Sequence, residues 1–495
     1  MTNGRLLWAD DEMELLRAHL LFLEKKGYEV VTVTNGTDAI EECRKGSFDL
    51  VLLDEMMPGL SGLETLQHIK ELTPQTPVVM VTKSEEEDIM NQAIGQQIAD
   101  YLIKPVNPNQ ILLTLKKNIH RREIVTETVQ QGYQQQFQQI AMQIMDCRTW
   151  QDWTDVYKRL VRWELELSAT DSQMTEMLDM QKQEANLGFA KYVKKNYMDW
   201  MNATPHSDQR SEKGSEHPMM SNELFKNRIF PLLNDGQKVF LVVLDNFRYD
   251  QWKMLEREIG DLFEIDEDVY CSILPTATQY ARNAIFSGLM PVQIAQMFPD
   301  LWVDEEEGKN LNEEPLIQTQ LDRYRRKNTF SYHKINTSAE AERFMQQLSQ
   351  LERNDLNVVV FNFIDMLSHA RTESKMVREL ANNESAYRSI TLSWFRHSVI
   401  ADLFRELAQS DYRVIITTDH GSIRTNTPVK IVGDRNTNTN LRYKLGKNLS
   451  YDSKDLFAIK EPQKAHLPAP NLSTSYVFAT GDSFFAYPNN YNYYV

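Results

Sequence analysis

The residues best suited to chemistry in this sequence are Asp419 and His420, which directly follow the β-branched run 414–418. Such a run ending at Asp-His-Gly is typical of a buried strand that delivers two metal ligands. A carboxylate and a neutral imidazole together suit zinc, and Gly421 lets the chain turn away without a side chain beside the ion. The same tripeptide also occurs in ordinary turns, so its meaning depends on partners elsewhere in the chain.

Two more carboxylates follow apolar runs of the same kind. Asp245 comes directly after 238–244, and Asp365 comes directly after 358–364. His369 lies four residues beyond Asp365. On a helical turn two residues at this spacing face the same way, so one cation can contact both side chains. The strand ends therefore predict a site built from carboxylates and imidazoles.

Hydroxyl groups precede a predicted helix between these runs. Thr276 and Thr278 lie at the end of the segment 273–278, just before a helical stretch that begins near Tyr280. The start of a helix attracts anions because its first N–H groups have no partner within the helix. An anionic group is therefore expected beside these threonines.

A second group of charged residues lies near the amino-terminal end. Five strand-like runs alternate there with helical stretches, which predicts a doubly wound parallel sheet. Such sheets place their chemistry at the carboxyl ends of the strands. Neighbouring carboxylates at one edge repel each other unless a cation joins them. The residues at these strand ends are Asp10, Asp11, Asp54, Thr82 and Lys104.

The stretch 121–200 is predicted to be helical because it has no strand-like run and no proline. Thr149 and Asp152 form a helix-start motif, and aromatic residues such as Trp153 recur at helical spacing. We interpret these aromatics as the core of a helical bundle and not as a nucleotide-stacking surface, because aromatics at this spacing are mostly core. The polar stretch 202–221 is predicted to be a flexible loop.

Composition limits the function classes. The chain has 495 residues and a formal net charge of -16, so we expect several domains and no general coating of nucleic acid. Its 3 cysteines are too scattered for a disulfide framework, which favours a reducing, cytoplasmic location. No apolar run approaches the roughly 20 residues of a membrane span, and no leader is expected.

The amino-terminal part resembles the receiver domain of two-component response regulators over residues 4–120. The resemblance implies that Asp54 accepts a phosphoryl group from a cognate sensor histidine kinase. Asp11, Asp54 and the Met56 carbonyl would hold Mg²⁺, and Asp10 would assist through water.

The remaining receiver residues follow from the same resemblance. Thr82 and Lys104 would contact the phosphoryl oxygens, and Tyr101 would be the aromatic switch that turns inward when Thr82 moves. Lys83 is a departure, since the family commonly has a small residue there, and we expect it to narrow the access to Asp54 or to slow hydrolysis of the acyl phosphate.

The carboxyl-terminal motifs resemble the alkaline phosphatase superfamily, most closely its PglZ and nucleotide pyrophosphatase/phosphodiesterase branches. The motifs are 244–248, 275–278 with 287–288, Asp365 with His369, and 418–421. The resemblance implies one zinc held by Asp245, Asp419 and His420 with a bridging threonine, and a second held by Asp365 and His369. Spacing favours Thr278 as the nucleophile, with Thr276 as the alternative.

One ligand of the second zinc is missing from this pattern. The superfamily usually supplies a third histidine near the carboxyl end, in PglZ-like chains within a His-Gly-Gly segment, and the sequence contains no such segment before Val495. Either the sequence lacks its tail or His466 takes this role, although a lone histidine beside prolines is more often a surface residue.

The expected fold is therefore α/β and multidomain. It comprises a doubly wound receiver at 1–120, a helical bundle at 121–201, the flexible loop at 202–221, and an alkaline-phosphatase-like α/β effector at 222–495 that is C-terminally truncated if the tail is missing. This order resembles the PorX-type family of response regulators associated with type IX secretion.

The resemblance implies a regulator whose phosphorylation at Asp54 controls formation of a homodimer and a zinc-dependent phosphodiesterase or phosphatase. Its implied substrates are cyclic or linear oligonucleotides. The alternative is a non-catalytic adaptor that binds a sigma factor or a sensor kinase. Neither hypothesis includes a module that reads duplex DNA.

Overall fold

The computed structural model describes residues 3–73, 76–83, 98–119, 121–168, 174–202, 217–303, 310–433, 437–451 and 456–486. The chain forms two compact units, Met1–Gly132 and Tyr133–Val495, and the division falls inside helix α6 (Arg121–Asp146). The predicted helical bundle therefore does not stand alone, because most of it packs with the effector as one unit.

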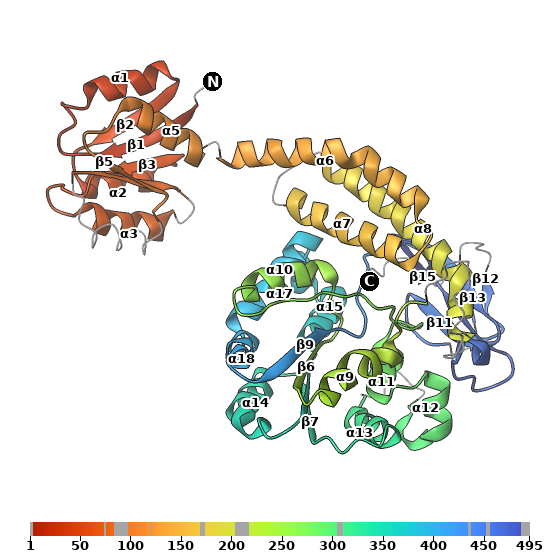
Figure 1. The fold of residues 1–495 in the computed structure, drawn as a ribbon. Coiled ribbons are helices and arrows are strands. Elements are labelled where there is room, and N and C mark those ends of the chain that lie inside the picture. The colour runs from red at the N-terminus through yellow and green to blue at the C-terminus, as the bar shows by residue number, and fades with distance from the viewer. Residues whose placement is uncertain are drawn as a thin grey trace. The chain divides into compact units, whose positions relative to one another are not determined.

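The first unit contains a five-stranded parallel sheet with the order β2-β1-β3-β4-β5. Helices α1 and α5 cover one face of the sheet, and α2 and α3 cover the other (Figure 1). This arrangement confirms the predicted doubly wound receiver. Its elements are β1 (Gly4–Ala9), α1 (Arg17–Lys25), β2 (Tyr28–Val33), α2 (Gly36–Lys45), β3 (Leu50–Leu53), α3 (Gly62–Leu72), β4 (Val78–Thr82), β5 (Asp100–Ile103) and α5 (Pro108–Ile119).

Apolar side chains on both faces explain why this sheet is buried. Successive residues of a strand point to opposite faces, so Leu7 of β1 packs with Leu66 of α3, whereas Leu6 packs with Ile111 of α5. The parallel direction of the strands brings their carboxyl ends, with Asp10, Asp54 and Lys104, to one edge.

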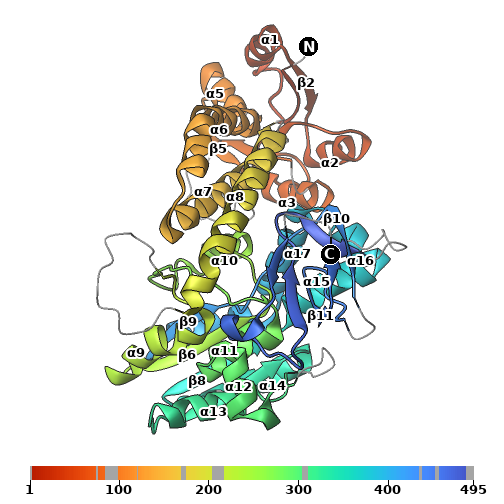
Figure 2. The same cartoon turned by 90° about the vertical axis from the view of Figure 1, so that its right-hand side faces the viewer.

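Three helices link the receiver to the effector: α6, α7 (Trp150–Ser168) and α8 (Met174–Asn202). The predicted helix start is confirmed, since the Asp152 N–H donates to Thr149 Oγ1 at 3.1 Å and the Thr149 N–H donates to Asp152 Oδ2 at 2.9 Å. Trp153 and Trp163 are buried, which confirms that the aromatic stripe is core. Both views show α7 beside α10 (Tyr249–Ile259) of the effector (Figures 1 and 2).

The effector is built on a four-stranded parallel sheet with the order β7-β8-β6-β9. Its strands are β6 (Lys238–Leu244), β7 (Phe330–Ile335), β8 (Leu356–Phe361) and β9 (Tyr412–Thr417). One face packs against α11 (Thr278–Ser287) and α13 (Glu313–Arg323), and the other packs against α10, α14 (Ser338–Leu351), α17 (Glu384–His397) and α18 (Val399–Ala408) (Figure 1).

Shorter elements complete the effector. The helices are α9 (Phe230–Asn234), α12 (Pro291–Met297), α15 (Phe363–Glu373) and α16 (Lys375–Leu380). Two three-stranded sheets, β12-β10-β15 and β11-β14-β13, follow β9 in the chain. Their strands are β10 (Thr427–Val432), β11 (Tyr443–Lys447), β12 (Ser450–Tyr451), β13 (Phe457–Ile459), β14 (Thr474–Phe478) and β15 (Ser483–Ala486).

One sequence-based expectation needs correction. The strand expected to run to Ile364 ends at Phe361, and Asp365 lies in the first turn of α15, so Asp365 and His369 share one helix. Most of the range 202–221, expected to be a flexible loop, lies outside the described residues, and Met220 and Ser221 at its described end are buried in the effector. Ser221 Oγ accepts a hydrogen bond from the Ile273 N–H at 3.1 Å, which holds this segment in place.

Among the described residues, none of the helices combines the length and the apolar character needed to cross a bilayer.

Replacement of Gly62 by alanine should destabilise the receiver. An added Cβ would lie 2.5 Å from the Asp54 carbonyl oxygen and 2.8 Å from Glu55 Cα, and these are backbone atoms. Overpacking of this kind costs about 1–3 kcal/mol. Urea unfolding of the full chain measures the loss. Gly46→Ala is the control, because its Cβ meets only the end of the Arg5 side chain, and equal stability of the two variants would contradict the expectation.

Candidate functional site

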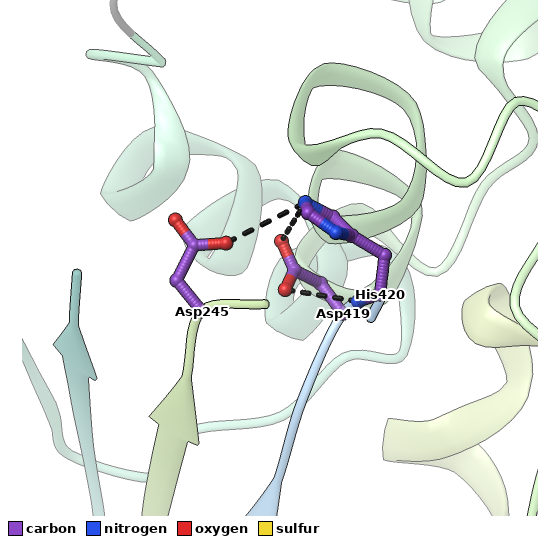
Figure 3. A group of neighbouring side chains, drawn as sticks. All are labelled: Asp245, Asp419 and His420. Carbon is purple, nitrogen blue, oxygen red and sulfur yellow. Dashed lines mark hydrogen bonds and ion pairs between the residues drawn. The ribbon is translucent and has the colours of Figure 1, made fainter. Parts of the chain in front are cut away.

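Asp245, Asp419 and His420 converge at the carboxyl ends of β6 and β9 (Figure 3). His420 Nε2 lies 3.6 Å from Asp245 Oδ1 and 3.9 Å from Asp419 Oδ2. One potential ligand atom from each residue lies within 4.8 Å of the others. The parallel strands therefore bring together donors that lie far apart in the sequence.

The electrostatics of this group favour a bound cation. Asp245 and Asp419 are both buried, and burial together with the nearby Asp419 charge raises the pKa of Asp245. Burial would lower the pKa of His420, but the charges of Asp419 and the other nearby carboxylates raise it. Asp419 Oδ2 is buried without a hydrogen-bond partner among the described residues. Two carboxylates and an imidazole with an unsatisfied oxygen fit the donor set of zinc.

Thr278 lies beside this group, and Thr276 does not. The Thr278 Oγ1 atom lies 2.9 Å from His420 Nε2 and 3.5 Å from Asp245 Oδ1. Thr278 is the first residue of α11, and the preceding Ala277 has no side chain that could cap the N–H groups of the helix. Thr276 is exposed. The geometry therefore favours Thr278 over Thr276, in agreement with the order that the spacing suggested.

Asp365 and His369 form a second, smaller group on α15. His369 Nε2 lies 3.6 Å from Asp365 Oδ2, and the His369 side chain is 69% exposed. Burial and the charge of Asp245 raise the pKa of Asp365, which reflects its closeness to the first group. The potential ligand clusters found among the described residues do not extend to this pair.

His466 does not join Asp365 and His369 in a common cluster of ligand atoms within the described part of the chain. It ends a short helical turn, where its Nε2 is 2.8 Å from the Met201 carbonyl oxygen of α8. Its own carbonyl accepts a hydrogen bond from the Val292 N–H of α12 at 2.9 Å. His466 thus connects the linker helix α8 with α12 of the effector, and its role as the third ligand, one of two alternatives, stays a prediction.

Asn246 connects the two groups. It is buried and adopts a left-handed backbone conformation with a φ of 59°, which asparagine tolerates better than most residues. Its backbone N–H points to Asp419 Oδ1 at 3.4 Å, and its side-chain amide donates to Asp365 Oδ1 at 3.2 Å. Asn246 therefore fixes the orientation of one carboxylate from each group.

Sequence reasoning missed the role of Arg282. This arginine is 1% exposed, and its Nη1 atom lies 2.7 Å from Asp245 Oδ2 and 3.6 Å from Asp419 Oδ2. Its Nε donates to Glu313 at 2.5 Å, and Glu313 also binds Lys334 and the Tyr332 hydroxyl. A signal was present, because Arg282 lies four residues after Thr278 and so on the same face of α11.

The receiver site also has its predicted charges together. Asp10, Asp11 and Asp54 each offer an oxygen within 4.8 Å of the others. Lys104 Nζ lies 2.6 Å from Asp10 Oδ2 and 2.9 Å from Asp54 Oδ2. Burial raises the pKa of Asp54, and the hydrogen bond from Lys104 opposes this. Asp11 is exposed, so water can reach this group of carboxylates. The group therefore fits Mg²⁺, which keeps several of its water ligands when it binds to protein.

The other receiver residues lie around this cluster. The side chain of Met56 is exposed, and its backbone N–H is hydrogen-bonded to Asp54. Thr82 is the last residue of β4 and is paired with Ile103 of β5. Tyr101 of β5 is half-buried against the α2–α3 face of the core. Lys83 is exposed and donates to Glu12 at 2.6 Å.

Replacement of Arg282 by methionine should sharply destabilise the effector in the presence of a chelator. Loss of the guanidinium leaves Asp245 and Asp419 buried without this cation and leaves Glu313 paired with Lys334 alone, and breaking a buried ion pair in this way costs about 3–5 kcal/mol. Denaturant unfolding of the full chain gives the change in free energy. Arg282→Lys keeps a positive charge and should lose less, whereas equal losses for both variants would show that the charge is unimportant.

Three family models match this chain. Residues 224–495 match the BREX system PglZ alkaline phosphatase-like domain, residues 123–201 match the PorX response regulator linker domain, and residues 6–116 match the response regulator receiver domain. The three matches occur in the order expected for a PorX-type response regulator.

Two curated relatives each match about a quarter of this chain. The uncharacterized transcriptional regulatory protein YkoG of Bacillus subtilis is 34% identical over 131 residues, which are 26% of this chain and 57% of YkoG. The transcriptional regulatory protein ResD of the same species is 34% identical over 117 residues, which are 24% of this chain and 48% of ResD. The chain thus spans about half the length of these relatives.

Solved structures also match the receiver part. A receiver domain from Clostridium thermocellum is 30% identical and covers 24% of this chain and 98% of its own, with a TM-score of 0.24. A CheY-like receiver from Methanospirillum hungatei is 28% identical. It covers 24% of this chain and 95% of its own, also with a TM-score of 0.24. The PglZ match spans more than half of the 495 residues, and this chain therefore belongs to the PglZ family of alkaline phosphatase-like proteins, joined to a response regulator receiver as in PorX-type regulators.

Proposed function

We propose that phosphorylation of Asp54 controls dimerisation of this chain and the activity of a zinc-dependent phosphodiesterase or phosphatase in its effector. The observation that carries the enzymatic part is the position of the Thr278 hydroxyl, 2.9 Å from His420 Nε2 at the first residue of α11. A hydroxyl beside metal-binding donors and at the start of a helix meets the requirements of phosphoryl transfer, which needs a nucleophile and a site for an anion.

The metal-binding residues divide into two sets. Asp245, Asp419 and His420 would hold one zinc ion, and Asp365 with His369 would contribute to a second. When bound, zinc lowers the pKa of a neighbouring hydroxyl and stabilises negative charge on a phosphoryl group. The second set would bind its ion more weakly, because it has fewer donors within the described residues.

The chain's own groups supply the remaining chemistry. Thr278 Oγ1 would lose its proton to solvent and attack the phosphorus atom. The bond from phosphorus to the leaving oxygen would break, that oxygen would take a proton from water, and the chain would carry a phosphothreonine or a nucleotidyl-threonine. Water would then release the phosphoryl group from Thr278. The uncapped N–H groups at the start of α11 would orient the phosphoryl oxygens.

The receiver would act as the switch. A cognate sensor histidine kinase would donate a phosphoryl group to Asp54, with Mg²⁺ held by Asp11 and Asp54 and with Lys104 on a phosphoryl oxygen. The new charge would favour the receiver conformation that forms a homodimer. Support comes from the cluster of Asp10, Asp11 and Asp54 and from the 2.9 Å contact between Lys104 and Asp54.

The proposed substrates are cyclic or linear oligonucleotides, the proposed location is the cytoplasm, and the proposed process is type IX secretion. All three rest on the resemblance to PorX-type regulators, whose linker model matches residues 123–201.

A second candidate function is a non-catalytic adaptor that binds a sigma factor or a sensor kinase. The observation in its favour is the sparse second set of ligands, where the His369 side chain is 69% exposed. An adaptor would retain the metal fold and bind its partner without turnover.

Replacement of Thr278 by valine should abolish hydrolysis of a nitrophenyl phosphodiester, because valine has nearly the same shape but no hydroxyl. Thr276→Val is the matched control and should retain activity close to wild type, and Thr278→Ser should retain a measurable part of it. Zinc content is measured on the same samples. Full activity of Thr278→Val would refute the role of Thr278, and zinc-loaded wild type without turnover would favour the adaptor.

A further inference from the structure

A continuous series of ion pairs runs from linker helix α7 to the candidate metal site. We propose that Glu164 of α7 is a positioning residue, and that through this series the linker holds the segments that carry both sets of metal-binding residues. The proposal deepens the proposed function and rests on it. We call the series the ion-pair ladder, and its members are Glu164, Arg388, Asp250, Arg248, Glu384 and Arg371.

The first step of the ladder crosses from the linker to the effector. Glu164 Oε1 lies 2.7 Å from Arg388 Nη1, and the same nitrogen lies 3.1 Å from Asp250 Oδ2 of α10. Arg388 of α17 is only 3% exposed. A guanidinium buried to this extent is stable only when carboxylates compensate its charge. Glu164 and Asp250 therefore together compensate the charge of Arg388.

The second step reaches the loop that follows β6. Arg248 binds Asp250 through two hydrogen bonds, Nε to Oδ1 at 3.0 Å and Nη2 to Oδ2 at 2.8 Å. This bidentate geometry fixes the plane of the guanidinium. Arg248 is the third residue after Asp245, so its position constrains the Asp245 loop. A Cβ on Gly421 would lie 3.5 Å from Arg248 Cγ, so Arg248 also packs beside the turn that carries His420.

The third step reaches α15. Glu384 lies 2.5 Å from Arg248 and 2.9 Å from Arg371, and Arg371 is on the same helix as Asp365. The ring of Tyr387 lies near both guanidiniums, 5.2 Å from that of Arg248 and 4.8 Å from that of Arg371. Burial would raise the pKa of Glu384, but the two arginines hold it at about 2. Glu384 therefore remains ionised at neutral pH.

The charges explain why the linker residue matters. Within the ladder, the effector supplies three guanidinium groups, from Arg388, Arg248 and Arg371, but only two carboxylates, from Asp250 and Glu384. Glu164 supplies the third carboxylate through Oε1, while its Oε2 lies 2.6 Å from Lys182 Nζ of α8. The Lys182 side chain is 35% exposed and can be hydrated, so the buried Arg388 depends more on Glu164 than Lys182 does. Without it, Arg388 would draw more strongly on Asp250, and Asp250 would hold Arg248 less firmly. The disturbance would reach the Asp245 loop and α15 together.

A second ion pair between the linker and the effector provides a matched control. Lys158, also on α7, lies 2.9 Å from Glu267, a residue of the effector. Among the described residues, neither Lys158 nor Glu267 forms an ion pair with a member of the ladder, and Glu267 contacts the neighbouring Tyr249 only through a hydrogen bond from its hydroxyl at 2.8 Å. If Glu164 merely docked the linker, removal of either pair would have the same consequences.

The experiment compares the full-length wild type with Glu164→Gln, Glu164→Asp and Lys158→Gln. Zinc affinity is measured by competition with a chromophoric chelator, and kcat and KM are measured with a nitrophenyl phosphodiester. Mutation of a residue that orients metal ligands without binding the metal itself typically lowers metal affinity by about 10- to 100-fold. We therefore expect Glu164→Gln to weaken zinc binding at least about tenfold and to lower kcat. Glu164→Asp should lie between Glu164→Gln and wild type, and Lys158→Gln should match wild type.

A double-variant cycle separates positioning from general loss of stability. Adding Arg388→Met to Glu164→Gln should weaken zinc binding by less than the product of the two single effects, because both residues act through one contact. Wild-type zinc affinity in Glu164→Gln, or equal weakening in Lys158→Gln, would overturn the proposal. If wild type binds zinc without turnover, the proposed activity fails while the zinc affinities still decide the role of Glu164; if wild type binds no zinc, both proposals are wrong.

Discussion

Two neighbouring buried carboxylates, Asp245 and Asp419, are the constraint on which the effector depends. They lie at the ends of adjacent parallel strands, so the sheet itself forces them together. Their mutual repulsion and their loss of water must be offset by positive charge. Arg282 supplies one such positive charge through its ion pair with Asp245, and Glu313 forms a further ion pair with Arg282. Thr278 and His420 lie beside the same carboxylates, where we propose that the metal ion binds.

The receiver also has buried carboxylates at the ends of parallel strands, and a cation offsets their repulsion there as well. Its parallel strands bring Asp10 and Asp54 to one edge, and Lys104 from the end of β5 joins them. In both units the sheet concentrates negative charge and a nearby cation balances part of it. The remaining imbalance suits the chemistry, because a phosphoryl group and its metal ion must enter a site that is neither neutral nor fully satisfied.

The sequence was informative where local patterns decide the structure. Strand ends located Asp10, Asp54, Asp245 and Asp419, helical spacing paired Asp365 with His369, and the Thr149 motif marked a helix start. Long-range contacts could not be predicted in this way. The pair of Arg388 with Glu164 joins residues 224 positions apart, and the Arg282–Glu313 pair depends on how α11 packs on α13. The contact of His466 with the Met201 carbonyl was equally out of reach, because Met201 lies on a distant segment of the chain.

Charge balance also gives the linker a role beyond connection. Helix α7 contributes a carboxylate to a network that is otherwise rich in arginine, and His466 and Met201 tie α8 to the effector. These contacts attach the linker to the part of the effector that carries the proposed metal-binding residues.

The most direct test of a phosphorylation-controlled enzyme is phosphodiester hydrolysis at fixed zinc, with and without beryllofluoride bound at Asp54, while the oligomeric state of the same samples is followed. The account predicts that hydrolysis requires zinc and changes together with dimerisation when beryllofluoride is added. Dimerisation without any cleavage of a phosphoester by the zinc-loaded protein would contradict it, and the effector would then be a binding domain.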